Sequence, residues 1–234
     1  MDNILQIRNL SKHYGKTHAL KGINLDIPRG KIVGVLGPNG SGKTTLIKTV
    51  MGLINDYQGD VNILGNTPGP SANTHVSYLP DRSHIPTWFT VGRAIDFFAD
   101  FYKDFDKAQA REMLSNMKIP TDKKIKTLSR GMEEKVQLSL VMSRRADLYV
   151  LDEPIGAVDP ASREFIIETI LKSFPESSSI LLSTHIIADI EPILDVAVFL
   201  KEGEIVMHGE VDTIREERSA SLDGLFREVF RNVY

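Results

Sequence analysis

Apolar residues alternate with polar ones at the start of the chain and later gather in short uninterrupted runs. Between residues 4 and 27 the alternation predicts half-exposed antiparallel strands. Continuous apolar runs at 31–36, 148–151 and 180–182 predict strands that are buried on both faces of a parallel sheet. The pattern therefore predicts an α/β protein with a mainly parallel sheet and an N-terminal antiparallel β subdomain.

Apolar positions recur at helical spacing between these predicted strands. The stretch 46–51 has this spacing and is followed by Gly52, a residue that suits a helix C-terminus. The stretches 94–118 and 133–145 also predict helices, and the loop at 66–84 is rich in proline and glycine, which is typical of a hinge.

The spacing of these segments predicts one domain with three parts. A core at 1–80 and 131–212 would carry the sheet, and an α-helical subdomain at about 81–130 would be inserted between its strands. A C-terminal amphipathic helix is expected within 213–234, where apolar residues repeat at spacings of three and one after a predicted cap at Ser221. We expect this helix to pack on its own domain, and a dimer contact is the alternative.

Composition limits the classes of function. The chain has 234 residues, of which 41% are hydrophobic, and its formal net charge is -3, so no nucleic-acid partner is expected. The absence of cysteine excludes disulfides and thiol nucleophiles. No apolar run approaches the ~18 residues of a membrane span, and the start of the chain lacks a secretory signal, so we expect a cytoplasmic chain.

A glycine-rich loop lies between the predicted strand at 31–36 and the predicted helix at 46–51. It fits the pattern Gly-x4-Gly-Lys-[Ser/Thr], in which backbone N–H groups surround phosphate oxygens, the lysine reaches the outer phosphates and the hydroxyl ligates Mg²⁺. A simple glycine turn is the alternative, which the strand–loop–helix context disfavours. The residues expected to contact a nucleotide are Gly37, Pro38, Asn39, Gly40, Ser41, Gly42, Lys43, Thr44 and Thr45. Of these, Lys43 is also a predicted catalytic residue and Thr44 a predicted ligand of Mg²⁺.

Two adjacent carboxylates follow the apolar run at 148–151. Asp152 is predicted to hold the hydration shell of Mg²⁺, and Glu153 to orient or deprotonate a water that attacks the γ-phosphate. An ordinary Asp-Glu turn before Pro154 is the alternative, and the phosphate loop upstream disfavours it. ATP and Mg²⁺ are therefore the expected ligands of a P-loop NTPase core.

The segment Leu128-Ser129-Arg130-Gly131-Met132 lies between the phosphate loop and the acidic pair. It resembles the Leu-Ser-Gly-Gly-Gln signature of ABC ATPases, and the order of the motifs is that family's order. This resemblance implies the nucleotide-binding subunit of an ABC transporter, in which Ser129 and Gly131 bind a γ-phosphate held by a second subunit. Taken alone, Ser129 is equally well explained as a helix N-cap.

Three further positions match the family. His185 resembles the switch histidine that contacts the γ-phosphate, which implies a catalytic role, and Asp159 resembles the aspartate of a loop that crosses the dimer interface. Tyr14 resembles the aromatic residue that stacks on adenine. Taken alone, His185 would be a structural or surface histidine, and Tyr14 an ordinary strand residue.

The sequence also departs from the family at several positions, of which the minor one is Ala157-Val158 in place of a leucine step before Asp159. Asp81 follows Tyr-Leu-Pro where many relatives have glutamine; it is predicted to be catalytic and to contact Mg²⁺, although its charge lies beside a polyphosphate. Arg130 replaces a small residue of the signature and adds charge, and Met132 replaces glutamine and removes a polar contact. These changes would retune the shared site without removing Ser129 or Gly131.

The resemblance implies a motor subunit that pairs head to tail with a second ABC ATPase subunit, as a homo- or heterodimer, around two MgATP. It would drive a separate integral membrane permease from the inner face of the cell membrane. The Tyr-Leu-Pro-acidic sequence and the amphipathic ending look most like bacterial exporters of drugs, peptides or lipids. A soluble ABC ATPase in a non-transport assembly is the alternative, and a P-loop kinase or non-ABC binding module is a third hypothesis.

Aromatic residues are concentrated in the predicted helical subdomain. Of 17 in the chain, seven lie between residues 88 and 105, namely Trp88, Phe89, Phe97, Phe98, Phe101, Tyr102 and Phe105. Phe97, Phe101 and Phe105 have the i, i+4 spacing of one helix face. Packing inside the subdomain is one explanation, and a docking site for a cytoplasmic helix of a membrane partner is the other.

Overall fold

The computed structural model describes residues 3–156, 158–175 and 177–231, and the strands of this part of the chain form two sheets. The larger sheet has the order β5-β6-β7-β3-β8-β9 and is parallel except for β9, which runs antiparallel to β8. Its strands are β3 (Ile32–Leu36), β5 (Val76–Leu79), β6 (Leu148–Asp152), β7 (Ser179–Thr184), β8 (Val196–Lys201) and β9 (Glu204–Glu210). The prediction of a mainly parallel sheet is confirmed.

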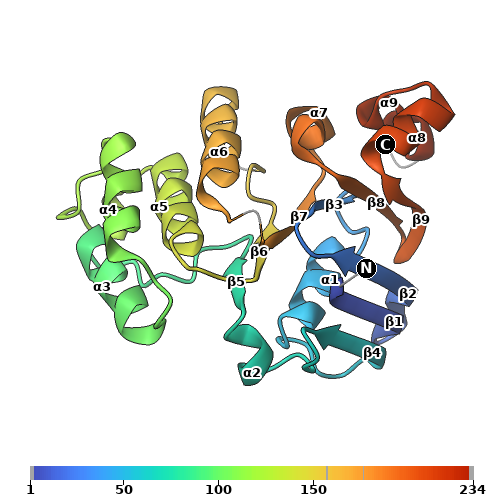
Figure 1. Cartoon of the computed structure of the whole chain (residues 1–234), viewed down its shortest axis with the longest axis horizontal. Helices are drawn as coiled ribbons and strands as arrows, with labels where there is room; N and C mark the ends of the chain where they lie inside the picture. The colour runs from blue at the N-terminus through green and yellow to red at the C-terminus, as the bar shows by residue number, and fades with distance from the viewer. Residues whose placement is uncertain (1–2, 157, 176, 232–234) are drawn as a thin grey trace.

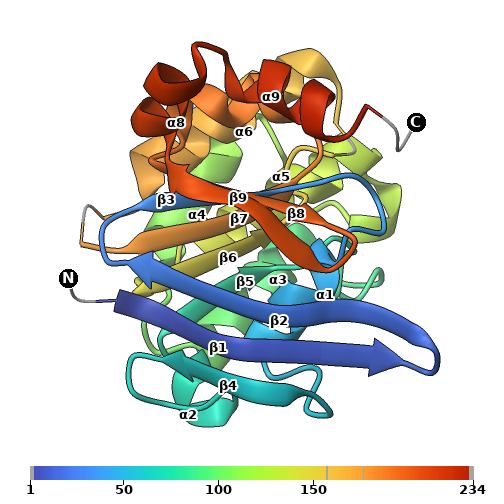
Figure 2. The same cartoon turned by 90° about the vertical axis from the view of Figure 1, so that its right-hand side faces the viewer.

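The smaller sheet is antiparallel and comes from the start of the chain, as the alternating pattern predicts. Its order is β2-β1-β4, and in Figure 2 it lies across the front of the molecule. Its strands are β1 (Asn3–Tyr14), β2 (Thr17–Pro28) and β4 (Gln58–Ile63). Tyr14 pairs with Thr17, so β1 and β2 are joined by a two-residue turn in which Gly15 has φ +58°.

The two faces of the larger sheet pack against different elements because side chains alternate along each strand. In β3, Ile32 and Leu36 face one cluster of apolar residues, and Val33 and Val35 face another. The second cluster also contains α1 (Lys43–Val50), which lies between the two sheets, and Gly52 follows α1 with φ +68°. The end of β3 and the start of α1 are therefore fixed by apolar packing on both sides.

One group of helices lies between β5 and β6 in the sequence: α3 (Val91–Phe101), α4 (Lys107–Asn116), the 3-10 turn η1 (Ile125–Thr127) and α5 (Arg130–Met142). The other elements are α2 (Pro70–Asn73), α6 (Pro160–Ser173), α7 (Ile187–Ile190), η2 (Glu191–Ile193), α8 (Val211–Arg218) and α9 (Leu222–Val229). In Figure 1, α3 and α4 lie at one end of the molecule and α7, α8 and α9 at the other, with α6 beside α5 and α2 below the sheet. No helix within the described residues combines the length and apolarity that crossing a bilayer requires.

The helical group between β5 and β6 has an apolar cluster of its own. Phe89, Ile95, Phe98 and Leu114 are buried there, and α5 contributes Leu140. The opposite side of α5 packs on the cluster of the larger sheet, so this helix joins the group to the core. The boundaries at 81–130, 131–212 and 213–234 stay predictions.

Two helix predictions need correction. The stretch 94–118 does not form one helix, because α3 ends at Phe101 and Asp106 begins α4 by accepting hydrogen bonds from two backbone N–H groups. Phe105 therefore lies outside α3, and the predicted stripe of Phe97, Phe101 and Phe105 on one helix face is wrong. The ending forms two helices, α8 and α9, and Ser221 caps α9 as predicted. Residues 232–234 lie outside the described residues.

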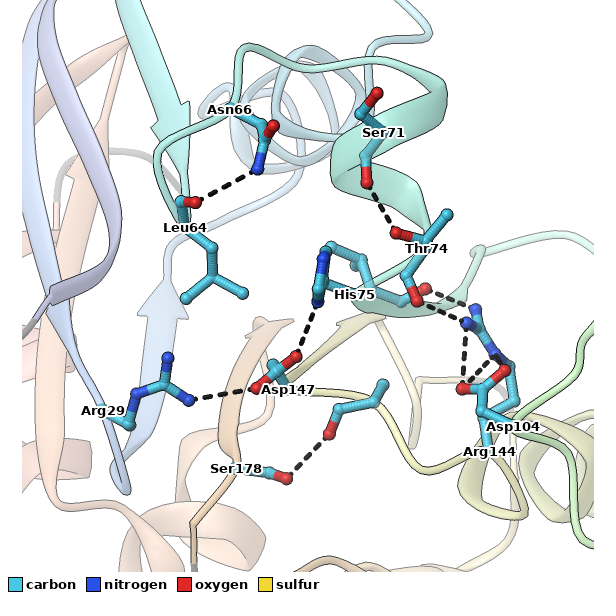
Figure 3. Close-up of polar contacts among 12 residues, drawn as sticks. Arg29, Leu64, Asn66, Ser71, Thr74, His75, Asp104, Arg144, Asp147 and Ser178 are labelled. Carbon is cyan, nitrogen blue, oxygen red and sulfur yellow. Dashed lines mark hydrogen bonds and ion pairs between the residues drawn. The ribbon is translucent and has the colours of Figure 1, made fainter.

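Arg144, just after α5, joins the helical group to the strand β5. Its side chain is only 4% exposed. The guanidinium donates to the carbonyl oxygen of Thr74 and to the carboxylate of Asp104, as Figure 3 shows. It also donates to the carbonyl oxygen of Val76. The ring of Tyr102 lies 3.9 Å from the guanidinium carbon. One buried cation thus connects the α3–α4 loop with the start of β5.

A buried carboxylate makes a similar connection at the other end. Glu191 is 6% exposed and accepts hydrogen bonds from Arg215 of α8 and from the backbone N–H groups of Leu222 and Asp223 at the start of α9. This carboxylate therefore anchors both C-terminal helices to the segment that follows β7.

Candidate active site

The glycine-rich loop follows β3, as predicted. Gly42 immediately precedes α1 and has φ +111°, and a Cβ atom there would lie 2.6 Å from the carbonyl oxygen of Ala19. Only glycine fits this position without a shift of the backbone. The loop therefore approaches β2 closely and leaves the free N–H groups of the helix start available to an anion.

Lys43 is the first residue of α1, and its side chain is 5% exposed. Its Nζ donates to the carbonyl oxygens of Gly37 at 2.8 Å and Pro38 at 3.2 Å, and it forms an ion pair with Glu153 Oε1 at 3.2 Å. The cation is thus held inside the loop and faces the acidic pair at the end of β6.

Asp152 ends β6 and is 1% exposed. Its Oδ1 accepts hydrogen bonds from Ser183 Oγ at 2.6 Å and Thr44 Oγ1 at 3.3 Å, whereas its buried Oδ2 has no hydrogen-bond partner in the described part of the chain. Burial raises the pKa of Asp152 because the charged form loses hydration. A cation at Oδ2 would favour the ionised form.

Glu153 and His185 come together from neighbouring strands. His185 Nδ1 lies 2.9 Å from Glu153 Oε2, and the glutamate side chain is 12% exposed. The backbone of Glu153 has φ +53°, in the left-handed region that non-glycine residues rarely adopt. Its N–H donates to Ser183, on β7. The carboxylate thus stands between an ammonium group and an imidazole.

These residues border two adjoining cavities. The first, of about 630 Å³, contains most of the predicted phosphate-loop residues, and Tyr14 lies at its edge with half of its surface exposed. The residues that the sequence predicts for the site and that line this cavity are Tyr14, Asn39, Gly40, Gly42, Lys43, Thr44, Thr45, Asp81 and Glu153. The second, of about 300 Å³, lies beside Asp81, Asp152, Glu153 and His185. The carbonyl oxygens of Gly37 and Pro38 accept hydrogen bonds from Lys43, and the hydroxyl of Ser41 is buried.

The remaining predicted residues do not line these cavities, although Arg130, between Ser129 and Gly131, lines the second. Among the described residues, neither cavity is lined by Ser129, Gly131 or Asp159. Ser129 caps α5 by accepting from Met132 N, and Asp159 caps α6 by accepting from Ser162, whose hydrogen bonds lower the pKa of the aspartate. Ala157, in the same predicted interface loop, lies outside the described residues.

Some neighbours of the site carry no signal in the sequence. Ser183 donates to Asp152 and accepts from the N–H of Glu153, although its own sequence position predicts neither contact. Glu134 and Gln137 of α5 line the second cavity. They come from a helix remote in sequence from Asp81, so only the fold brings them to the site.

The fold and this site define a P-loop nucleotide-binding protein. The model of the family described as ABC transporter matches residues 20–156, more than half of the chain. The chain belongs to the ABC transporter family as one of its ATP-binding proteins.

Individual proteins similar to this chain are also ATP-binding proteins of ABC transporters. The chain is 29% identical to the ABC transporter ATP-binding protein YtrB of Bacillus subtilis, over 92% of this chain and 74% of that protein. It is 30% identical to MJ1023 of Methanocaldococcus jannaschii, an uncharacterized ABC transporter ATP-binding protein, over 90% of this chain and 79% of the relative. A solved ATP-binding subunit of an ABC transporter has a TM-score of 0.85 at 28% identity, covering 96% of this chain and 98% of the other.

Proposed function

We propose that the chain is the ATP-hydrolysing motor subunit of an ABC transporter and drives a separate membrane permease. The observation that carries this proposal is the Glu153 carboxylate, which lies 3.2 Å from Lys43 Nζ and 2.9 Å from His185 Nδ1. A carboxylate held in this way at a phosphate-binding loop can orient and deprotonate an attacking water, and His185 fixes its orientation.

The residues present fit ATP and Mg²⁺. The buried Oδ2 of Asp152 has no partner among the described residues, and Thr44 bonds the other oxygen of the same carboxylate. Mg²⁺ would be held by Thr44, Asp152 and Asp81, and when bound it neutralises charge on the phosphates. Lys43 and the N–H groups of the loop would bind the phosphates, and Tyr14 would stack on the adenine.

Replacing Glu153 with glutamine tests this assignment. The rate of phosphate release is expected to fall about 10²–10⁴-fold, the usual contribution of a general base, while ATP binding is retained. Glu164→Gln removes an exposed carboxylate from α6 and serves as the control. Unchanged turnover in Glu153→Gln would contradict the assignment, and a phosphorylated product in place of free phosphate would indicate a kinase.

Ser129, Gly131 and Asp159 support a head-to-tail dimer. They lie outside both cavities of their own chain, and Ser129 with Gly131 stands at the start of α5, where N–H groups can bind a phosphate. We propose that they complete the site of a second ABC ATPase subunit.

The permease would dock beside the helical group. A cavity of about 980 Å³ lies between α1 and the helical group of α3, α4 and α5. Leu53 and Phe101 line this cavity and are 61% and 69% exposed. Phe98, by contrast, is buried in the group's own cluster. A cytoplasmic helix of the permease with apolar residues on one face fits this surface. The chain would thus lie on the inner face of the cell membrane, and the family resemblance favours export.

Capture of tagged Glu153→Gln protein from its native cells, in mild detergent with MgATP, tests the permease. A polytopic membrane protein in stoichiometric amount is expected, and Phe101→Ser should lose it while keeping the fold. Leu171→Ser, at a residue of α6 that is 44% exposed, is the control. Recovery of soluble partners alone would favour the soluble ABC ATPase assembly.

A further inference from the structure

Lys12, on β1, carries a buried charge and, in the described part of the chain, lines neither cavity of the candidate site. Its side chain is 6% exposed, although lysine is almost never buried without a partner. Its Nζ donates to the backbone carbonyl of Asp56 and, at 3.1 Å, to Oδ2 of the same residue. The Asp56 side chain is fully exposed and solvated by water, so this ion pair compensates little of the cost of burying the ammonium. A further partner is therefore expected.

The ring of Tyr14 is that partner. Lys12 Nζ lies 5.0 Å from the centre of this ring, within the distance at which an ammonium is attracted to the face of an aromatic ring. An ammonium has three N–H groups, and the two oxygens of Asp56 accept two of them. The third N–H group is available to the electron-rich face of the ring, so the ring contributes to holding the buried charge.

Tyr14 has little else to fix its orientation. It is the last residue of β1, at the end of the β1–β2 hairpin, and its surface is 50% exposed. A side chain in such a position samples several rotamers, and fixing it when a ligand binds reduces the affinity. Tyr14 lines the first cavity, whereas the ammonium is shielded from solvent. The contact with Lys12 thus leaves the part of the ring that faces the cavity free for a ligand.

We propose that Lys12 is a positioning residue for the nucleotide base, which holds the Tyr14 ring in the orientation that stacks on adenine. This inference rests on the proposed function, in which Tyr14 contacts the adenine. A cation on one face of the ring also draws electron density away from the other face, which reduces the repulsion between the ring and a stacked purine. Lys12 acts through Tyr14 and has no contact of its own with the nucleotide.

The partner of Lys12 gives the ammonium a second connection. Asp56 lies in the segment between α1 and β4, and α1 begins at the phosphate loop. One buried cation therefore joins the ring that would bind the base to the segment that follows the helix that would bind the phosphates. A fixed distance between these two parts favours a ligand that carries both a base and phosphates.

The affinities of ADP and of inorganic pyrophosphate, measured by calorimetry, test the inference. Lys12→Met should weaken ADP binding by about 2–30-fold, the usual range for a lost cation–π contact, and leave pyrophosphate binding unchanged because that ligand has no base. Lys12→Arg should retain most of the ADP affinity, since a guanidinium also binds an aromatic face. Lys31→Met removes the same charge from a lysine that pairs with Asp195 at 3.3 Å, and this control should bind both ligands normally.

A double-mutant cycle separates this role from a merely structural one. In a Tyr14→Leu chain, Lys12→Met should cause no further loss of ADP affinity, whereas in a Tyr14→Phe chain, which keeps the ring, the loss should persist. Circular dichroism verifies that each variant is folded, and Lys12→Gln gives the same comparisons if Lys12→Met does not fold.

Three results would overturn the inference. The first is equal ADP affinity in Lys12→Met and Lys31→Met. The second is an equal loss for ADP and pyrophosphate, which would mean that Lys12 acts on the phosphates or on the fold. The third is a further loss in the Tyr14→Leu chain, which would make Lys12 independent of the ring. ADP is not hydrolysed, so these results do not depend on the role of Glu153, and the inference and the proposed function fail separately.

Discussion

Replacing Arg144 with alanine is expected to lower the free energy of unfolding by about 2–4 kcal/mol, because the buried carbonyl of Val76 loses its donor and Asp104 loses its partner. The guanidinium is 4% exposed and is hydrogen-bonded to Asp104 and to the carbonyls of Thr74 and Val76. The Asp104 side chain is 28% exposed and can regain water, so the cost stays below that of a fully buried ion pair. In a chain of this size 1 kcal/mol shifts Tm by about 2–4 °C, so Tm should fall by roughly 4–16 °C.

The neighbouring residue provides the control. Arg145 has the same charge, but its side chain is 76% exposed and pairs with Asp106 at 3.3 Å, so Arg145→Ala should cost under about 0.5 kcal/mol. Urea unfolding followed by circular dichroism measures both variants. Arg144→Lys should fall between them because an ammonium cannot reproduce the planar fork. Equal stability of Arg144→Ala and Arg145→Ala would refute the reasoning.

Two further predictions concern stability. Glu191→Ala should destabilise the chain by about 3 kcal/mol, because two N–H groups of α9 lose their acceptor and Arg215 is left with its longer contact with Asp212, at 3.8 Å, whereas exposed Glu217→Ala should not. Calorimetry measures the Tm of both variants, and equal Tm values for Glu191→Ala and Glu217→Ala would contradict the prediction. Backbone hydrogen bonds lower the pKa of Asp106 at the start of α4. The ionised carboxylate therefore stabilises the folded chain at a pH above the ordinary carboxyl pKa, and this stabilisation is lost as the pH falls through the lowered pKa. The Tm difference between the unmodified chain and Asp106→Ala should therefore shrink in acid, and a difference that is independent of pH would contradict this origin.

The strands β1, β2, β3, β6 and β7 were predictable because their own sequences indicate their surroundings. The continuous apolar run of β3 reflects burial on both faces, and the alternation in β1 and β2 reflects one exposed face. The strand β5 was missed, because it lies within the stretch 66–84, whose composition predicted a loop. The break between α3 and α4 was not predictable. It depends on Asp106, whose backbone N–H donates to Ser143 at the distant end of α5 and whose side chain caps α4.

The site divides in the same way. Lys43, Thr44, Asp152 and Glu153 belong to short contiguous motifs, and the structure brings them together as those motifs predict. Gln137 lines the second cavity only because of where α5 packs. Helical periodicity places this residue on α5 but does not indicate that it reaches the site. Contacts between distant segments are the part that sequence patterns leave undetermined.

The route of the chain between β5 and β6 has an evolutionary consequence. These strands are paired neighbours, with Val76 opposite Leu148, and α3 and α4 form an excursion between them. The excursion takes no part in the sheet, so its length and surface can change while the strand order and the phosphate loop stay the same. Exchanging residues 82–129 between relatives would therefore make chimeras that keep the same nucleotide-binding core and differ in the partner that the exchanged segment contacts.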